Sequence, residues 1–478
     1  METPVTAVVL AAGAGTRMRS SLAKVLHEIG GRSLLGHALV AVRSARPDQV
    51  VVVVGQDREQ VGRHALACDS AVRTVVQDEQ RGTGHAVQVA LDSLDQVVGS
   101  VLVTYGDVPL LQPETLVALL EDQARGGHAV SVLTAELADP GGYGRVLRDG
   151  TGAVQAIREH KDATAAELEV REVSSGTYAF DADFLVAALP RVGSDNAQGE
   201  VYLPDVVALA VDEGRTVNAV LCADVWQTEG VNDRVQLARL GAELNRRTLE
   251  GWMRAGVTVV DPASTWVDVT VTLERDVTVR PGTQLHGLTA VGPGAIVGPD
   301  TTLTDTLVGA GASVVRTHGS GAELGPRASV GPFAYLRPGT QVLEGGKVGT
   351  FVETKNARIG AGAKVPHLSY VGDADVGEGS NIGAGTIFAN YDGVAKNRTV
   401  VGRHCSTGSH NVFVAPVSIG DGAVTGAGTV VRRDVPPGAL AVSAGAQRHL
   451  EDWVARKRPD SAAARAAAES DPPSDLDR

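Results

Sequence analysis

The stretch Leu324–Gly349, LGPRASVGPFAYLRPGTQVLEGGKVG, carries an aliphatic residue at every sixth position. These positions are Leu324, Val330, Leu336, Val342 and Val348, and glycine follows three of them. A period of six with small residues behind the aliphatic ones is typical of hexapeptide repeats, in which each unit forms one short flat face of a triangular coil. The aliphatic side chain points inward and stacks on its counterpart in the next coil. The stretch therefore predicts a left-handed parallel β-helix.

The same period extends to both sides of this stretch. It runs through Val291, Val297 and Leu303, then Ile359, Val365 and Val371, and finally Ile419, Thr425 and Val431. It breaks at residues 390–400, NYDGVAKNRTV, which we expect to form a loop ejected from the coil. Loops on a rigid scaffold often carry function. The tail from about residue 456 is rich in Ala, Ser, Asp and Pro, and we expect it to be disordered.

Up to about residue 230 the chain alternates apolar strands with amphipathic stretches. We expect Ser33 to cap a helix at its N-terminus and Pro113 to open another at its first position. Strict alternation predicts a Rossmann-like α/β fold with a mainly parallel sheet and ligands at the carboxyl ends of its strands. We therefore divide the chain into an α/β domain (1–230), a helix (231–256), a β-helix (257–455) and the tail (456–478). The helix could equally belong to the first domain or serve as a linker.

Composition limits the classes of partner. A net charge of −13 argues against nucleic acid, which needs a basic surface, but not against small anions held by a few cations. No apolar run is long enough for a membrane span, and residues 1–4 show no secretory signal. The three cysteines are far apart and show no metal-binding spacing. We therefore expect a cytoplasmic enzyme without a nucleic-acid or membrane partner.

A glycine loop, Leu10–Met18 with the sequence LAAGAGTRM, follows the first predicted strand. It is not a dinucleotide fingerprint, because Met18 stands where the third glycine belongs, and it lacks the Gly-Lys-Ser/Thr of a P-loop. Alone it could be a tight turn. Arg17 inside the loop and Lys24 after it favour a phosphate site, because backbone N–H groups and two cations can hold a triphosphate and neutralise a pyrophosphate leaving group.

Leu10–Arg17 resembles the signature of nucleoside-diphosphate-sugar pyrophosphorylases. Further matching segments are Gln77 with 82–86 (GTGHA), 105–109 (YGDVP), 142–145 (GYGR), 159–163 (EHKDA), 196–200 (NAQGE) and 229–232 (EGVN). With the repeats, nearly the whole chain except the tail is similar to the bifunctional N-acetylglucosamine-1-phosphate uridylyltransferase/glucosamine-1-phosphate acetyltransferases.

This resemblance implies two reactions that lead to UDP-N-acetylglucosamine, a peptidoglycan precursor. The β-helix would acetylate glucosamine-1-phosphate with acetyl-CoA, and residues 1–230 would then transfer uridylyl from UTP and release pyrophosphate. Asp107 and Asn232 would hold Mg²⁺, while Arg17 and Lys24 would act on the phosphates. The other residues implied in this site are Leu10, Ala11, Ala12, Gly13, Gly15, Tyr105, Gly106 and Ser174, with Gln77, Gly82 and Thr83 reading uracil and Gly144 and Glu159 contacting the sugar.

For the β-helix the resemblance implies His367 as the general base that takes a proton from the glucosamine amine. The residues that would bind the sugar phosphate are Arg337, Lys355, Tyr370 and Asn381. Those that would bind acetyl-CoA are Ala384, Asn390, Tyr391, Ser409 and Ala427. The resemblance also implies a homotrimer with acyl-transfer sites between subunits.

Three residues depart from the family pattern. Ser174 stands where an Asn usually contacts the acceptor sugar, Ala23 replaces a usual proline, and Ala444 stands where some relatives have a CoA-contacting Arg. We expect weaker acceptor binding with retained activity.

Two other interpretations of the chain stay open. One is a monofunctional pyrophosphorylase whose β-helix only assembles or regulates, and the other is a non-catalytic trimeric scaffold. Arg337, Lys355, His367 and Tyr370 argue against the first, and the Gly13–Arg17 loop with Asp107 argues against the second.

Overall fold

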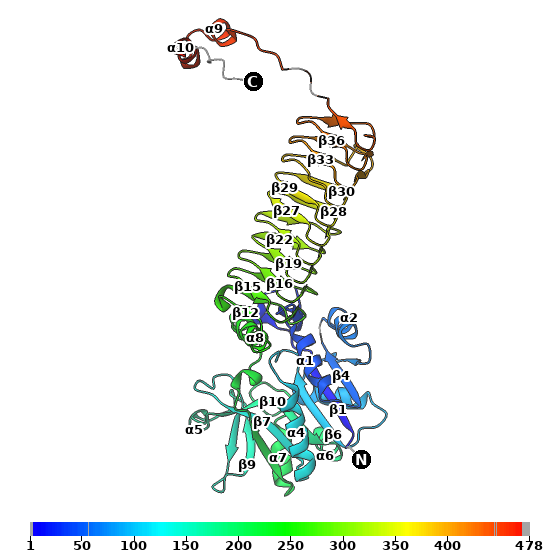
Figure 1. Ribbon diagram of the computed structural model, residues 1–478. Helices are drawn as coiled ribbons and strands as arrows, with labels where there is room; N and C mark the ends of the chain where they lie inside the picture. The colour runs from blue at the N-terminus through cyan, green and yellow to red at the C-terminus, as the bar shows by residue number, and fades with distance from the viewer. Residues whose placement is uncertain (1–2, 56, 444, 446, 471–478) are drawn as a thin grey trace. The chain divides into compact units, whose positions relative to one another are not determined.

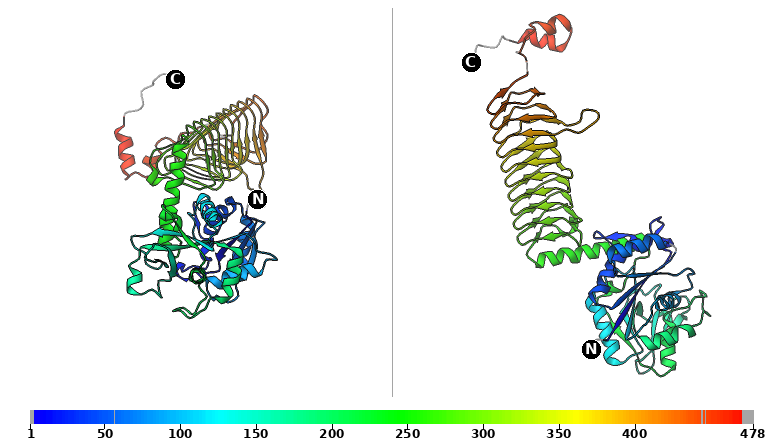
Figure 2. Two further views of the ribbon diagram at one scale, coloured as in Figure 1. Left: turned by 90° about the horizontal axis from the view of Figure 1, so that it is seen from below. Right: turned by 90° about the vertical axis from the view of Figure 1, so that its right-hand side faces the viewer.

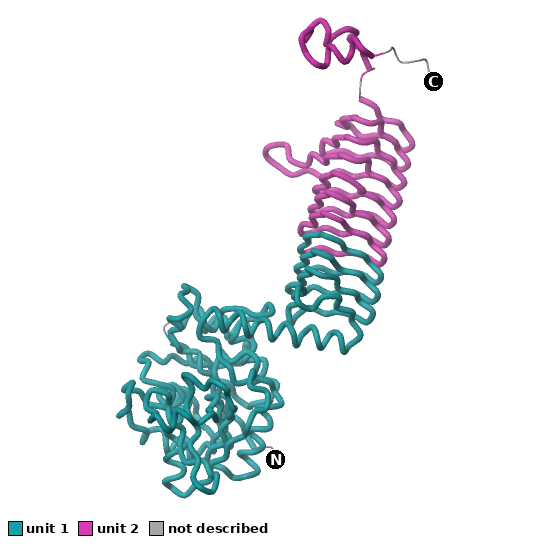
Figure 3. The backbone as a smooth tube through the Cα atoms, turned by 90° about the vertical axis from the view of Figure 1, so that its left-hand side faces the viewer, with its two compact units in different colours: residues 1–320 teal, residues 321–478 magenta. Residues whose placement is uncertain are grey.

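The structure is a computed structural model that describes residues 3–55, 57–443, 445 and 447–470. It divides into two compact units, residues 1–320 and 321–478, drawn in teal and magenta in Figure 3. None of the described helices is both long and apolar enough to cross a membrane.

The first unit begins with a nine-stranded sheet (Figure 1). Its main path, β11-β7-β10-β6-β1-β4-β5, consists of β1 (Val5–Ala11), β4 (Gln49–Val54), β5 (Arg73–Val76), β6 (Ser100–Tyr105), β7 (Val130–Glu136), β10 (Glu172–Asp181) and β11 (Val217–Leu221). β10 is antiparallel to β6 and β7, whereas the other neighbours on this path pair in parallel. β8 (Arg145–Arg148) and β9 (Val154–Arg158) form a hairpin beside β10. The prediction of a mainly parallel α/β sheet is confirmed.

Helices cover both faces of this sheet. One core holds Val8 and Val51 with α3 (Thr83–Asp92), α6 (Ala182–Ala188) and α7 (Asp205–Asp212). The other core holds Val9 and Val52 with α1 (Leu34–Ser44), α2 (Arg58–Cys68) and α4 (Pro113–Gly126). Neighbouring valines enter opposite cores because successive side chains of a strand point to opposite faces. A short α5 (Ala165–Leu168) completes the helices of this part.

The predicted helix starts are present. Oγ of Ser33 accepts a hydrogen bond from the Gly36 N–H over 2.9 Å, and Pro113 is the first residue of α4. Short elements connect the layers: the 3₁₀ helices η1 (Thr16–Met18), η2 (Lys24–Leu26), η3 (Leu189–Arg191), η4 (Val225–Thr228) and η5 (Pro262–Ser264), and the hairpin of β2 (Glu28–Ile29) and β3 (Arg32–Ser33).

Helix α8 (Arg234–Arg254) joins the sheet region of the first unit to its first coils (Figure 2). The buried Asn245 donates from Nδ2 to the Thr265 carbonyl over 2.8 Å and accepts the Val267 N–H over 3.0 Å. The Val269 N–H donates to the Gly30 carbonyl in the β2–β3 turn. These contacts explain why the first coils belong to the first unit. Their strands are β12 (Thr258–Val259), β13 (Trp266–Val267), β14 (Thr272–Leu273), β15 (Thr278–Val279), β16 (Gln284–His286), β17 (Ala290–Val291), β18 (Ile296–Val297), β19 (Thr302–Thr304), β20 (Leu307–Val308), β21 (Ser313–Val314) and β22 (Thr317–Ser320).

The second unit continues as short parallel strands wound into coils. Tyr335 pairs with Glu353, and Glu353 pairs with Tyr370, so one coil takes 17 or 18 residues, or three hexapeptides. The five aliphatic residues of the repeat in Leu324–Gly349 are at most 3% exposed, so the predicted inward-facing positions and the parallel β-helix are confirmed. The strands are β23 (Glu323–Leu324), β24 (Ser329–Val330), β25 (Ala334–Leu336), β26 (Gln341–Val342), β27 (Lys347–Thr350), β28 (Glu353–Ile359), β29 (Lys364–His367), β30 (Tyr370–Val376), β31 (Ile387–Ala389), β32 (Thr399–Val401), β33 (Ser406–Thr407), β34 (Val412–Val414), β35 (Val417–Ile419), β36 (Val424–Thr425), β37 (Val430–Val431) and β38 (Leu440–Ala441).

Two segments of the second unit lie outside the regular coils. The predicted loop is present between β31 and β32 and projects from the stack (Figure 3). In the tail, where we expect disorder, the structure describes residues only up to 470 and places α10 (Ala462–Glu469) there, while α9 (Trp453–Lys457) spans the predicted start of the tail. The physical reason is local: α10 is mostly alanine, the strongest helix former, and Ser461 caps it by accepting the Ala464 N–H over 3.1 Å.

Candidate active sites

The glycine loop follows β1 at the carboxyl edge of the sheet. Gly15 has a φ of 58°, and a Cβ there would lie 2.6 Å from Cβ of Lys24, so glycine lets the loop pass close to this lysine. A Cβ at Gly13 would meet no described atom within 4 Å. Nε2 of Gln80 donates to the Ala12 carbonyl over 2.6 Å and supports the loop. The backbone at Gly13 is therefore held in place and open to a ligand.

Two polar pairs join the loop region to the ends of other elements. Nη2 of Arg17 donates to Oδ1 of Asn232 over 3.0 Å. The ammonium of Lys24 forms an ion pair with Asp107, and these two side chains are 13% and 14% exposed. The two cations predicted to act on phosphate thus contact the two side chains predicted to hold Mg²⁺.

A cavity of about 350 Å³ lies beside the glycine loop. The predicted residues that line it are Leu10, Ala11, Ala12, Gly13, Lys24, Gln77, Gly82, Thr83, Tyr105, Asp107 and Asn232. Gly15 and Gly106 are not among its lining residues; they shape the loop and the turn after β6. Val25, Gln80, Ala86 and Glu200 also line it and were not predicted; of these, Ala86 and Glu200 lie in segments that carry the resemblance.

A second cavity, of about 360 Å³, shares Tyr105, Asp107 and Asn232 with the first. The other predicted residues that line it are Arg17, Gly144, Glu159 and Ser174. Tyr143, Gly176, Tyr178, Gly230 and Gln236 line it as well and were not predicted. The two cavities therefore form adjoining compartments, with Asp107 and Asn232 in their common wall.

Glu159 lines the second compartment, and other carboxylates lie near enough to act on it. Burial raises the pKa of Glu159, and the nearby Asp205, Asp162 and Glu200 raise it further. Burial also raises the pKa of the Tyr105 hydroxyl, with Glu159 adding to the effect. A second anion would be repelled by such groups, whereas the hydroxyl groups of a sugar can donate to them. A phosphate group in this compartment would be favoured near Arg17, the cation that lines the same cavity.

Ser174 lies in the wall of the second compartment and is 7% exposed. Its Oγ is 2.9 Å from the Tyr178 hydroxyl and accepts the Gly176 N–H over 3.2 Å. Gly176 has a φ of 80°, and a Cβ there would lie 2.3 Å from the Tyr105 ring, so glycine is required. The Ser174 hydroxyl is thus already engaged inside the protein.

Asp107 and Asn232 offer a carboxylate and an amide oxygen from one wall. This donor set fits Mg²⁺, which binds proteins through one or two carboxylates and takes its other ligands from substrate phosphates and water. Within the described residues, no group of three or more His, Cys, Asp or Glu side chains forms a separate metal centre. A cation at this wall would be shared with a phosphate substrate.

In the second unit, Arg337 and Lys355 lie on successive coils at equivalent positions, because Leu336 pairs with Thr354. Nη1 of Arg337 donates to Glu353 over 2.9 Å. The side chain of Lys396, from the projecting loop, lowers the pKa of Lys355. Cations this close together favour the binding of an anion between them, such as a phosphate group.

Asn390 and Tyr370 lie beside these cations. Nδ2 of Asn390 donates to Asp373 over 2.5 Å and to the Tyr370 hydroxyl over 3.4 Å. The other oxygen of Asp373 accepts from Asn356 over 2.8 Å. Asp373 therefore orients the buried Asn390; it carries no motif that sequence reasoning could use.

His367 is the last residue of β29 and pairs with Thr350 of the coil before. Its carbonyl accepts from the Gly385 N–H over 3.3 Å and from Oγ of Ser369 over 2.7 Å. The backbone is thus anchored, while the side chain is exposed on a single chain. Asn381 is a bridge partner of Lys364, the first residue of the same strand.

Three of the five residues expected to bind CoA, namely Ala384, Ser409 and Ala427, occupy one corner of three successive coils. The Ala384 carbonyl accepts the His410 N–H over 2.7 Å, and the Ser409 carbonyl accepts the Gly428 N–H over 2.8 Å, which aligns Ala384, Ser409 and Ala427. Tyr391 is exposed on the projecting loop. Ala444 lies outside the described residues.

Comparison with known proteins covers both parts of the chain. Residues 7–170 match the family profile of the MobA-like NTP transferase domain. Over its length the chain is similar to three proteins that each bear the name bifunctional protein GlmU. The one from Pseudarthrobacter chlorophenolicus is 59% identical over 467 residues, which are 97% of this chain and 95% of that protein.

The other two relatives agree in extent. That from Kineococcus radiotolerans is 61% identical over 97% of this chain and 94% of its own. That from Streptomyces avermitilis is 58% identical over 97% of both chains. With such identity across nearly all of each sequence, this chain belongs to the bifunctional GlmU protein family.

Proposed function

We propose that the chain is a bifunctional enzyme of UDP-N-acetylglucosamine synthesis. It acetylates glucosamine-1-phosphate in its β-helix and transfers a uridylyl group from UTP to the product in its α/β domain. One observation carries this proposal furthest: two adjoining compartments meet at Asp107 and Asn232, which contact the cations Lys24 and Arg17.

We assign the functions to segments of the chain. Residues 1–230 form the uridylyltransferase domain, residues 231–256 a linker helix, residues 257–455 the acetyltransferase domain and residues 456–478 a tail. A cytoplasmic location suits the cysteines, which are all unpaired, Cys68 being exposed and the other two buried.

In the first unit, UTP occupies the compartment of the glycine loop, with its uracil against Gln77, Gly82 and Thr83. Nε2 of Gln77 already donates to the Gly82 carbonyl over 3.0 Å, so these groups lie together at one edge of this compartment. N-acetylglucosamine-1-phosphate occupies the second compartment, with its hydroxyl groups toward Glu159 and Gly144. This placement puts both phosphates at the wall between the compartments.

The reaction then needs no protein nucleophile. An oxygen of the sugar phosphate attacks the α-phosphorus in line, the bond to the β-phosphate oxygen breaks, and pyrophosphate leaves. Arg17 and Lys24 exchange their contacts with Asn232 and Asp107 for phosphate oxygens and offset the charge of the leaving group. Asp107 and Asn232 are then available for Mg²⁺, which when bound supplies further neutralisation of phosphate charge.

In the β-helix, we assign the sugar phosphate to Arg337, Lys355, Tyr370 and Asn381. His367 takes a proton from the glucosamine amine as the amine nitrogen attacks the acetyl carbonyl carbon of acetyl-CoA. The carbon–sulfur bond breaks, and CoA leaves as the thiol once its sulfur takes up the proton that His367 removed. Ser409 or neighbouring amides stabilise the oxyanion, and Ala384, Asn390, Tyr391 and Ala427 contact CoA.

We further propose a homotrimer. Phe333, Phe351 and Leu368 are 50%, 58% and 59% exposed and lie on successive coils, because the Phe351 N–H donates to the Phe333 carbonyl and the Leu368 N–H to that of Thr350. A contiguous exposed apolar column suits burial against another copy of the chain. His367 and Tyr391, exposed on a single chain, would then be enclosed.

Two half-reactions, each assayed with Mg²⁺, test the proposal. Pyrophosphate release from UTP and N-acetylglucosamine-1-phosphate reports on the α/β domain, and free thiol from acetyl-CoA and glucosamine-1-phosphate reports on the β-helix. Pyrophosphate without thiol would favour a monofunctional pyrophosphorylase. Neither product would favour a non-catalytic scaffold.

A further inference from the structure

A loop between β11 and α8 carries part of the second compartment. It comprises residues 222–232, called here the 222–232 loop. Gly230 and Asn232, near its end, line the second compartment, and Asn232 also lines the first. The position of this loop therefore decides where the Asn232 amide lies relative to Asp107.

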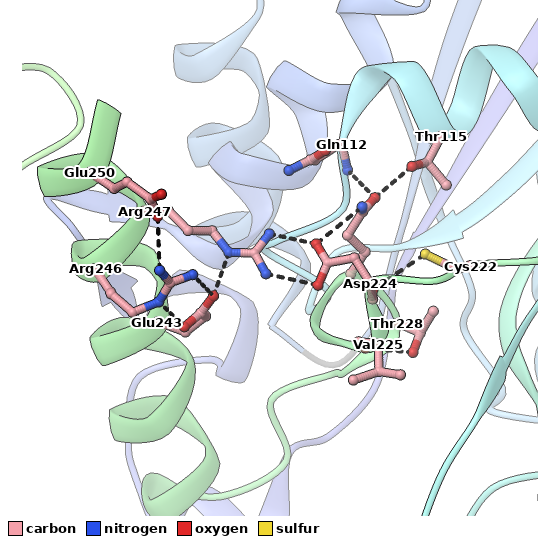
Figure 4. Close-up of polar contacts among 11 residues, drawn as sticks. Gln112, Thr115, Cys222, Asp224, Val225, Thr228, Glu243, Arg246, Arg247 and Glu250 are labelled. Atoms are coloured by element: carbon pink, nitrogen blue, oxygen red, sulfur yellow. Dashed lines mark hydrogen bonds and ion pairs between the residues drawn. The ribbon is translucent and has the colours of Figure 1, made fainter. Parts of the chain in front are cut away.

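Arg247 of α8 bonds to the beginning of this loop (Figure 4). Its Nη1 and Nη2 donate to the two carboxylate oxygens of Asp224 over 2.7 and 2.9 Å, and its Nε donates to Glu243 over 2.7 Å. The side chains of Arg247 and Glu243 are 22% and 9% exposed. A two-point contact of this kind fixes direction as well as distance, which a single charge contact does not.

Through Gln227, Asp224 is also linked to the start of α4. Oδ2 of Asp224 accepts from Nε2 of Gln227 over 3.3 Å. Oε1 of Gln227 accepts from the Thr115 hydroxyl over 2.6 Å and from the Gln112 N–H over 3.2 Å. Figure 4 shows the side chains of Arg247 and Asp224 pointing toward each other, with Thr115 on the far side of Asp224 from Arg247. The first half of the loop is therefore held on both sides.

The second half of the loop is held by the first turns of α8 and by the end of β6. Arg239 forms an ion pair with Glu229 and lies over the Trp226 ring, 5.2 Å from its centroid. The Val231 N–H donates to the Asp107 carbonyl over 2.9 Å. These contacts place Asn232 directly after a residue bonded to Asp107.

Helix α8 itself has a fixed support. Asn245, two residues before Arg247, is buried. Its side-chain amide nitrogen and oxygen bond to the backbone of Thr265 and Val267 respectively. Arg247 thus extends from a helix that is anchored to the first coils, and the loop is the partner that it can hold in place.

We propose that Arg247 is a positioning residue for uridylyl transfer, which acts through Asp224 to hold the 222–232 loop so that Asn232 faces Asp107. It touches no substrate. The inference rests on the proposed function of the first unit and adds to it a residue outside both compartments.

The neighbouring Arg246 is a matched control. It donates to Glu243 and to Glu250, both in α8, and its side chain is 58% exposed. Arg246→Ala therefore removes ion pairs of the same helix without cutting a bond to the loop. Arg247→Ala cuts the two bonds to Asp224. Arg247→Lys keeps the charge but loses the two-point contact with Asp224. Its effects should therefore lie between those of Arg246→Ala and Arg247→Ala.

The experiment measures hydrogen–deuterium exchange of peptides from the 222–232 loop, together with both half-reactions, in the full-length chain. We expect Arg247→Ala to speed exchange in this loop. We also expect the Mg²⁺ concentration for half-maximal pyrophosphate release to rise about tenfold, with acetyl transfer unchanged. Arg246→Ala should resemble the wild type in all three readouts.

Three outcomes separate the possibilities. Wild-type exchange and Mg²⁺ dependence in Arg247→Ala, or an equal change in Arg246→Ala, would overturn the proposal. If Arg247→Ala fails to fold, which loss of its thermal unfolding transition would reveal, Asp224→Asn weakens the same contact from the loop side and decides the matter by the same readouts. If the wild type released no pyrophosphate, the proposed function would fail, while the exchange comparison would still test the role of Arg247 in holding the loop.

Discussion

The guanidinium of Arg17 donates to Oδ1 of Asn232 over 3.0 Å, joining two residues 215 positions apart in the sequence. Beside it, Lys24 forms an ion pair with Asp107. The same four side chains offer two cations for phosphate oxygens and two oxygen donors for a metal cation. Each cation has a protein partner that it can exchange for phosphate when substrates enter.

Replacing Arg17 with alanine tests this exchange. Arg17→Ala should lower the rate of uridylyl transfer by about 10²–10³-fold, because the leaving pyrophosphate loses a preorganised donor. Acetyl transfer by the same protein should be unchanged. Arg125→Ala, which removes an exposed pair with Glu121 on α4, is the control and should keep both activities. A rate equal to that of the wild type would show that Arg17 does not act on phosphate.

Ser174→Asn restores the residue usual in the family at a wall of the second compartment. The longer amide can reach the acceptor, whereas the serine hydroxyl is bonded to Tyr178. We expect the KM for N-acetylglucosamine-1-phosphate to fall about fivefold with the KM for UTP unchanged, as one added hydrogen bond would give. Tyr178→Phe, which removes one of the two contacts of the Ser174 hydroxyl without lengthening the side chain, is the comparison. An unchanged acceptor KM in Ser174→Asn would contradict the expected weakness of the wild type.

His367→Ala should lower acetyl transfer by about 10²–10⁴-fold, because the attacking amine loses its general base. Uridylyl transfer serves as the internal control, since none of the residues proposed for it lies in the second unit. Assays of both half-reactions on one preparation give the answer. Loss of both activities would contradict a chain with two separate sites.

A further prediction concerns pH and the first coils. Nδ1 of His286 lies 3.3 Å from Oδ2 of Asp268, and this hydrogen bond raises the pKa of His286 above 6.5. Burial alone would raise the pKa of Asp268, but hydrogen bonds from His286 and the Gly287 N–H lower it below 3.8. The pair therefore stabilises the fold most between these two values, and its contribution is lost as pH rises through the raised pKa of His286.

The measurement is the Tm of the wild type and of His286→Gln across this range. Because the imidazole is partly exposed, we expect the wild type to lose only about 1–2 °C relative to the variant between about pH 6 and pH 8. Parallel curves for the two proteins over this interval would mean that the pair contributes nothing to stability.

Short sequence patterns predicted those features of the fold that depend on neighbouring residues, such as the coils of the β-helix and the starts of helices. The positions of Leu336 and Val342 follow from a six-residue period, and both are fully buried. Ser33 and Pro113 mark their helices because capping depends on a few adjacent residues. The tail shows the opposite case, because composition suggested disorder whereas the alanine run forms α10.

The sites were predictable only where a motif carried them. Arg17 and Asp107 lie in recognisable segments, and the structure brings them to adjoining compartments. Tyr178 and Asp373 carry no local signal, because their roles depend on which strands and coils become neighbours. Arg247 belongs to the same class: only the fold brings it to Asp224.

The presence of two active sites on one chain is tested by a single reaction of the purified chain with glucosamine-1-phosphate, acetyl-CoA, UTP and Mg²⁺, resolved by chromatography. We expect UDP-N-acetylglucosamine, free CoA and pyrophosphate all to appear. If the nucleotide sugar forms only when N-acetylglucosamine-1-phosphate is supplied ready-made, the chain does not acetylate its own substrate, and the claim of two active sites is contradicted.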